Sequence, residues 1–313
     1  MSDFIREEVV TLNDFKKITH HRVYSPGFAE EVAKNRKRRK TFTLDGNLNI
    51  VAVDHPARGS LAVGEKNLAM GNRHDLLARL VSVLKCDVMD GVLASTDILE
   101  ELLILHGEMH KKGKGFLDEK LLITSLNRGG LLGSVWELND PITAGNVRTC
   151  VKLGIDASKM LLRVDMSSAD TLNTILACAE GVRDMNKENM PIFLEPLPVE
   201  YINNQYKIVK QADSLIPLIT MTAALGNYSR NIWLKIPYTE EFNRVVDSTT
   251  LPIVILGGER NSLENTLQSI KSAMKTGHQV RGAMLGRNVL YPENSTPAAV
   301  AEAVGLIVHE GSR

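Results

Sequence analysis

Short apolar runs rich in valine, isoleucine and leucine recur along the 313-residue chain. Runs of this kind, without polar alternation, are typical of strands buried on both faces, as parallel strands are. They predict eight strands, at Leu48–Asp54, Asp87–Ala94, Leu121–Leu126, Lys159–Asp165, Pro191–Pro196, Ile232–Pro237, Pro252–Gly257 and Gly282–Gly286.

Between these runs, apolar residues recur three and four positions apart, the spacing of a helix with one buried face. We predict helices at Asp75–Leu84, Ser95–Lys111, Ala169–Arg183 and Ser262–Lys275. Strands begin roughly 20 to 40 residues apart, the length of a strand with its crossover helix. Eight such units favour an α/β fold, a single (β/α)8 TIM barrel over residues 46–313. A doubly wound open sheet is the alternative, but it usually has fewer strands, and no Gly-x-Gly-x-x-Gly follows the first run.

Residues 1–45 form an extension ahead of the predicted barrel. Glu7–Lys17 has the spacing of a helix. Lys34–Lys40 is a dense basic run, with two open interpretations: a cover for the bottom of the barrel, or a patch for phosphate or nucleic acid. Arg39–Asn47 contains Asp-Gly, a dipeptide of tight turns, so we expect a small hairpin that plugs the barrel floor.

The composition narrows the class of protein. Apolar residues make up 43%, enough for a sizeable core, and 37 basic residues balance 37 acidic ones. This balance argues against binding to nucleic acid or to an anionic membrane. The three cysteines lack metal-site spacing, and no apolar run approaches the roughly 18 residues of a membrane span. The first residues do not resemble a signal peptide, so we expect a cytoplasmic enzyme.

Charged residues lie at the C-terminal ends of the predicted strands, where TIM barrels build their active sites. Lys235 interrupts the apolar run Ile232–Pro237. An unpaired buried ammonium is costly, so such a lysine is either ion-paired or has a lowered pKa. A neutral amine attacks carbonyl carbon and forms a Schiff base. From the sequence pattern alone, Lys235 can be interpreted either as a catalytic lysine or as a member of a structural ion pair.

Glu195 and Lys159 occupy neighbouring predicted strands and are expected near Lys235. A second cation helps a lysine to lose its proton, and a carboxylate can shuttle protons, although each residue alone also fits a salt bridge. Asp54 ends the first strand, and His55 after it is a candidate acid–base partner or metal ligand. Because no metal-binding histidine motif is present, we predict no metal and no cofactor.

Two glycine-containing loops follow the last two predicted strands, the usual phosphate site of this barrel. Glycine lets the backbone approach an anion closely, and an arginine can clamp it. We therefore expect an anion at Gly257, Gly258, Gly286 and Arg287.

The glycine-rich segment Asn127–Thr143 follows the third strand. It is interpreted either as a loop that closes over the substrate through Arg128 or Trp136, or as an ordinary surface loop. Arg163, on the fourth strand, is a further candidate for substrate binding.

Several of these segments together resemble one family, the class I aldolases that act on deoxyribose phosphate, tagatose bisphosphate and, in archaea, fructose bisphosphate. The likeness covers about residues 40 to 295 and is strongest to the tagatose-bisphosphate branch. Asn127–Gly130 with its following loop resembles an aldolase-like subgroup associated with inositol degradation. The matching segments, in family order, are Val51–His55 with Arg58–Ser60, Lys159–Asp165, Pro191–Pro196, Trp233–Pro237, Leu256–Gly258 and Leu285–Asn288.

The resemblance implies Lys235 as the Schiff-base lysine, Lys159 and Glu195 as its proton-transfer partners, and Asp54 as a ligand of substrate hydroxyls or an aid to proton transfer. It also implies that Gly258 and Arg287 hold a phosphate. The chain departs from the pattern in two places. His55-Pro56-Ala57 is inserted after Asp54, and Glu259-Arg260 follows the glycine pair, where Glu259 is an unusual neighbour for a phosphate.

The resemblance thus implies a metal-independent aldolase that cleaves a phosphorylated keto-sugar or keto-sugar acid. 2-Deoxy-5-keto-6-phosphogluconate is the first candidate substrate, followed by fructose or tagatose bisphosphate and then by a sulfonated sugar phosphate. Thiolase-like acyl transfer on the same lysine is an alternative activity. A non-catalytic sugar-phosphate-binding or scaffold barrel is the alternative from another class. We expect a homo-oligomer that binds a small molecule, with no nucleic acid or membrane as partner.

Overall fold

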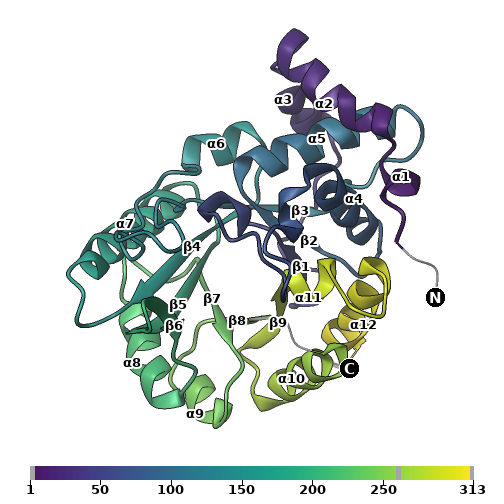
Figure 1. The fold of residues 1–313 in the computed structure, drawn as a ribbon. Helices are drawn as coiled ribbons and strands as arrows, with labels where there is room; N and C mark the ends of the chain where they lie inside the picture. Colours follow the sequence, from purple (N-terminus) through teal and green to yellow (C-terminus); the bar gives the residue numbers. More distant parts are fainter. Residues whose placement is uncertain (1–3, 259–261, 311–313) are drawn as a thin grey trace.

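Eight parallel strands form a closed barrel surrounded by helices (Figure 1). The computed structural model describes residues 4–258 and 262–310. The first and last barrel strands β1 and β9 pair, and β4 pairs with β5, so the sheet has no open edge in the barrel. The barrel strands are β1 (Leu48–Ala52), β2 (Gly91–Ala94), β3 (Leu121–Ser125), β4 (Ala157–Val164), β5 (Ile192–Ile202), β7 (Ile232–Pro237), β8 (Ile253–Leu256) and β9 (Val280–Leu285). Each predicted strand overlaps one of these, and the closed sheet rules out the doubly wound alternative.

Helices cover the outside of the barrel (Figure 1). The four predicted helices are present as α4 (Arg73–Leu84), α5 (Thr96–His110), α7 (Asp170–Lys187) and α10 (Leu263–Thr276). The others in the barrel region are α6 (Val147–Lys152), α8 (Ala212–Ala223), α9 (Phe242–Asp247), α11 (Arg287–Leu290) and α12 (Pro297–Glu310), with short 3-10 turns at Pro56–Arg58 and Ala69–Gly71. No helix in the described ranges is both long and apolar enough to cross a bilayer.

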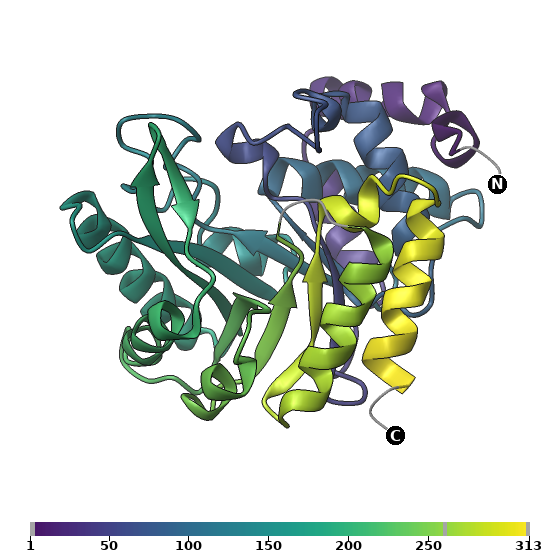
Figure 2. The same cartoon turned by 60° about the horizontal axis from the view of Figure 1, so that its bottom comes forward.

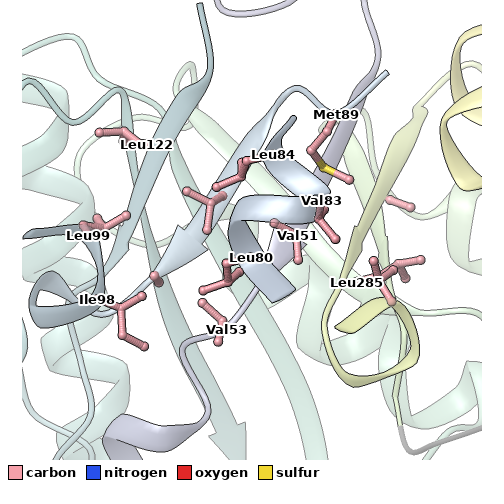
Figure 3. Close-up of a cluster of buried hydrophobic side chains, with 14 of the residues drawn as sticks. Val51, Val53, Leu80, Val83, Leu84, Met89, Ile98, Leu99, Leu122 and Leu285 are labelled. Carbon is pink, nitrogen blue, oxygen red and sulfur yellow. The ribbon is translucent and has the colours of Figure 1, made fainter. Parts of the chain in front are cut away.

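Apolar side chains fill two regions separated by the strands. The outer region lies between the barrel and the helices, where Val51 of β1, Leu80 of α4 and Leu99 of α5 belong to one buried cluster (Figure 3). The inner region fills the barrel floor, and Ile50 and Phe193 belong to it. Successive residues of a strand point to opposite faces, so one apolar run supplies both regions.

The N-terminal extension contains α1 (Arg6–Val9), α2 (Leu12–Tyr24) and α3 (Phe28–Asn35). The prediction of one helix over Glu7–Lys17 was wrong, because the first helix ends at Val9 and a second one begins at Leu12. Thr11 is the reason: its side chain accepts a hydrogen bond from the backbone of Asp14 and so begins a new helix.

The predicted hairpin at Arg39–Asn47 was also wrong, since this segment contains no strand. Asp45 instead accepts a hydrogen bond from the backbone of Asn47. The segment does reach the barrel floor, because Phe42 lies 5.7 Å from the ring of Trp233 and 6.2 Å from that of Phe193. An aromatic side chain, rather than paired strands, closes the bottom of the barrel.

The basic run is built into this lower end of the barrel. The buried guanidinium of Arg36 donates to three backbone carbonyls and to the carboxylate of Asp156. Arg38 also pairs with Asp156 at 2.7 Å, and Arg39 pairs with Asp90 at 2.7 Å. Of the two interpretations of Lys34–Lys40, the cover for the barrel bottom is the one these contacts support.

A two-stranded hairpin that was not predicted extends β5 beyond the barrel (Figure 2). Val199–Ile202 pairs antiparallel with β6 (Gln205–Ile208). Asn203 and Asn204 form the turn with φ angles of 53° and 60°, the left-handed conformation that tight hairpins require. The hairpin projects from the end of the barrel to which the strand arrows point.

Candidate active site

Three charged side chains lie one layer above the apolar floor of the barrel. On β4, β5 and β7 they are Lys159, Glu195 and Lys235, each two residues after a member of the floor. Because side chains alternate along a strand, all three face the barrel interior. Their exposed fractions are only 1%, 7% and 4%.

Glu195 joins the two lysines. One carboxylate oxygen accepts a hydrogen bond of 2.7 Å from the ammonium of Lys235, and the other contacts the ammonium of Lys159. Each amine therefore has its own oxygen on the same carboxylate. This geometry permits a proton to pass between the lysines through Glu195.

Asp54 extends the network toward β1 and β3. Its Oδ2 atom lies 3.2 Å from Nζ of Lys159 and accepts a hydrogen bond of 2.6 Å from Ser125. The guanidinium of Arg128 contacts the same carboxylate and donates to the Ser125 hydroxyl at 2.9 Å. The sequence analysis missed Ser125. Its position as a polar residue at the C-terminal end of a buried strand could have identified it as a site residue.

The connected network holds three basic and two acidic side chains. Burial lowers the pKa of Lys235, Glu195 opposes this, and the charges of Arg128 and Arg287 lower it further. Burial and Arg128 place the pKa of Lys159 well below its usual range. Burial alone raises the pKa of Glu195, but the two ammonium groups lower it by more. The carboxylate stays ionised, and each lysine loses its proton more readily than an exposed lysine does.

His55 lies at the edge of this network. Its Nδ1 atom is 3.9 Å from the carboxylate of Asp54 and has no hydrogen-bond partner. Burial, with the charges of Arg287 and Lys235, places the pKa of His55 well below its usual range. The ring is therefore a neutral imidazole at physiological pH, with one nitrogen that can donate and one that can accept a hydrogen bond.

The two loops predicted to bind an anion, after β8 and after β9, contact each other. Arg287 donates to the backbone oxygen of Gly258 at 3.2 Å. Gly258 has a φ of 63°, a conformation that suits glycine. Gly286 is needed for close packing, since a Cβ there would lie 2.6 Å from the backbone oxygen of Ala52. Gly257 accepts a hydrogen bond from Asn288. Glu259 and Arg260 lie outside the described residues.

Arg163 binds the long loop after β3. Its guanidinium contacts the carboxylate of Glu137 and donates to the backbone oxygen of Gly130. Arg58 also approaches Glu137, at 3.4 Å. Burial, together with the charge of Arg58, lowers the pKa of Arg163 to about 10. Glu137 is thus a loop anchor that the sequence analysis did not single out.

The same loop sends one predicted side chain inward and one outward. Arg128 points to Asp54, whereas Trp136 is 49% exposed and donates to the backbone oxygen of Gly129. Asn127 fixes the start of the loop, because its side chain bonds to both backbone groups of Leu161. The loop is therefore held to the barrel mouth at Asn127, Arg128 and Glu137, while Trp136 faces outward.

A protein-family model described as Cgl0159-like matches residues 46–306. The chain belongs to the Cgl0159-like family. It is 37% identical to Cgl0159 from Corynebacterium glutamicum, whose crystal structure matches with a TM-score of 0.91 over 97% of this chain and 99% of that one.

Two archaeal enzymes are more distant relatives of this Cgl0159-like protein. It is 34% identical to 2-amino-3,7-dideoxy-D-threo-hept-6-ulosonate synthase 1 of Archaeoglobus fulgidus, over 71% of this chain and 78% of the relative. It is 28% identical to the synthase of that name in Halobacterium salinarum, over 60% of this chain and 66% of the relative. An archaeal fructose 1,6-bisphosphate aldolase shares the fold, with a TM-score of 0.60 and 20% identity over 90% of this chain and all of that one.

Proposed function

We propose that this protein is a class I aldolase in which Lys235 forms a Schiff base with the ketone of its substrate. The observation that carries the proposal is the buried network of three basic and two acidic groups. Arginine keeps its charge, so loss of one proton from the lysine pair makes the network electrically neutral. A neutral amine at the mouth of a TIM barrel is the nucleophile that Schiff-base chemistry needs.

Glu195 supplies the route for that proton. The pKa of each lysine lies below its usual range, and Glu195 contacts both amines. Transfer of the proton from Lys235 through Glu195 to Lys159 leaves Lys235 neutral and Lys159 charged beside Asp54. Glu195 thus acts as a relay and Lys159 as the proton store.

The steps then follow from this arrangement. Lys235 attacks the ketone carbon, and Lys159, through Glu195, returns a proton so that the hydroxyl leaves as water. The resulting protonated Schiff base accepts the electron pair when the adjacent carbon–carbon bond breaks. The hydroxyl on the carbon that becomes the aldehyde gives its proton to Asp54, and the aldehyde departs. The enamine that remains on Lys235 then takes up a proton at carbon. Hydrolysis releases the ketone product and frees Lys235.

The names of relatives support a phosphorylated keto-sugar or keto-sugar acid as substrate. Two are synthases of a heptulosonate, and one structural neighbour is described as a Schiff-base-forming fructose-1,6-bisphosphate aldolase. The resemblance of Asn127–Gly130 to the inositol-degradation subgroup makes 2-deoxy-5-keto-6-phosphogluconate the first substrate to test. Fructose and tagatose bisphosphate follow. We assign the substrate phosphate to Gly257, Gly258, Gly286 and Arg287, with His55 and Arg128 nearer the reacting carbons.

Borohydride trapping tests the proposal. Sodium borohydride reduces a Schiff base to a stable amine, so treatment with the substrate panel is expected to add the mass of the ketone to the peptide that contains Lys235. Lys235→Met should lose the adduct and at least a thousandfold in kcat, because the covalent route is gone. Lys207→Met, on the exposed hairpin, is the matched control and should keep both.

Other results would assign other functions. Turnover by a folded Lys235→Met protein would refute the nucleophile. Absence of an adduct with every ketose and keto acid, under conditions in which a known aldolase reacts, favours a binding or scaffold barrel. Transfer of an acyl group without cleavage of a ketose phosphate favours the thiolase-like activity.

A further inference from the structure

Lys210 lies beside the glycine pair at the barrel mouth and was not among the predicted site residues. It follows the hairpin strand β6 and precedes α8. A Cβ on Gly258 would lie 3.6 Å from Nζ of Lys210, so the ammonium lies beside the face of Gly258 that a side chain would occupy. No described carboxylate lies within ion-pair distance of this exposed ammonium.

The backbone that carries Lys210 is held on both sides. The hydroxyl of Thr239, just after β7, donates to the backbone oxygen of Lys210. The preceding residue, Val209, donates its backbone N–H to Pro198 at 2.9 Å. The foot of the hairpin is therefore tied to two barrel strands, and these ties decide where the lysine emerges.

Two cations from separate parts of the chain thus meet at Gly258. Arg287, at the start of α11, donates to the backbone oxygen of this glycine, and Lys210, after the hairpin, places its ammonium 3.6 Å from the position a Cβ would take there. Lys210, Gly257 and Gly258 also line one small pocket of about 70 Å³, together with Tyr238 and Thr266. An anion in the loop would be contacted by a planar guanidinium and a compact ammonium.

We propose that Lys210 is a substrate-binding residue that reads the charge of the anionic group held by this loop. The inference rests on the proposed function for the identity of that group, a phosphate monoester. A doubly charged phosphate gains more from a second cation than a singly charged carboxylate does. The hairpin thereby contributes to specificity, since it delivers the lysine to the loop.

The test compares Lys210→Met with Lys207→Met, which removes a lysine of the same hairpin three residues earlier. Lys210→Met should raise KM for the phosphorylated ketose about tenfold and leave kcat within twofold, the loss expected for one charge-assisted contact. Competitive inhibition by inorganic phosphate should weaken by a similar factor. Lys210→Arg should restore part of both, and high salt should reduce the difference between wild type and Lys210→Met. Lys207→Met should behave as wild type.

A separate measurement distinguishes failure of this inference from failure of the proposed function. Thermal stabilisation by inorganic phosphate, against chloride at equal ionic strength, needs no turnover. If it is smaller in Lys210→Met than in wild type and Lys207→Met, Lys210 binds the anion even when no borohydride adduct forms. If phosphate stabilises all three proteins equally, or none of them, the inference is wrong. A KM unchanged in Lys210→Met would overturn it while leaving the Lys235 adduct as evidence for the aldolase.

Discussion

Arg128 is the one basic group of the buried network that cannot become neutral. It is 5% exposed and shares Asp54 with Lys159 and Ser125. Its fixed charge lowers the pKa of both buried lysines. Arg128 therefore helps to set the pH at which an amine of the pair is neutral, besides any contact with substrate.

The pH dependence of Schiff-base formation checks this role. Arg128→Gln removes a charge that lowers the pKa of Lys235, so that pKa should rise. The amine is then neutral only at higher pH, and the curve of borohydride-trapped adduct against pH should shift upward while its plateau remains. Lys207→Met, on the exposed hairpin, is the control, because it removes a charge far from the buried network. A curve that stays in place, or moves to lower pH, would show that Arg128 does not tune the lysine.

Residues 36–47, between α3 and β1, form no helix or strand, so their role depends on side-chain contacts. Arg36, with no exposed side-chain surface, fastens this segment to the loops below β3 and β4 through three carbonyls and Asp156. Burial lowers the pKa of Arg36 while Asp156 opposes the shift, yet a guanidinium remains charged at physiological pH. The segment thus belongs to the stability of the barrel floor.

Arg36→Met should lower the free energy of unfolding by about 3 kcal/mol, because it leaves Asp156 and buried carbonyls without their donor. Urea denaturation followed by circular dichroism measures the change. Lys34→Met removes an exposed lysine from the same basic run and should cost less than about 0.5 kcal/mol. Equal losses in the two variants would contradict a structural role for Arg36.

At the scale of the whole molecule, the site exists because the sheet closes. β4 and β5 are hydrogen-bonded neighbours in the barrel wall, which places Lys159 beside Glu195, and the next strand, β7, adds Lys235. No cluster of three or more potential metal ligands occurs in the part of the chain that the structure describes. The proposed electron sink is the protonated Schiff base, which needs no metal.

Prolonged treatment with a strong chelator is therefore expected to leave kcat and KM unchanged. The assay is triose-phosphate release by protein dialysed against the chelator, with a metal-dependent aldolase as the positive control. Activity that is lost on dialysis and regained with a divalent cation would contradict the Schiff-base mechanism.

Much of the barrel and several residues of the candidate site could be predicted from the sequence. Apolar runs predicted the barrel strands because a strand buried on both faces tolerates few polar residues, and Lys235 and Glu195 were conspicuous for the same reason. The hairpin was missed, although polar and apolar residues alternate on both sides of Asn203-Asn204. The prediction relied on continuous apolar runs, and the mostly exposed strands of this hairpin contain none. Lys210 carried no local signal, because an exposed lysine after a loop is ordinary.

Local pattern by itself determined which residues form the barrel strands and which face of each strand they occupy, since apolar runs mark strands buried on both faces and side chains alternate along them. Only the tertiary structure decided which inward-facing groups touch. Closure of the barrel gives each oxygen of Glu195 its own lysine, turns Arg128 toward Asp54 and places Phe42 under the floor. Those contacts join residues far apart in sequence, and their distances depend on how all the strands pack together, which no short stretch of sequence specifies.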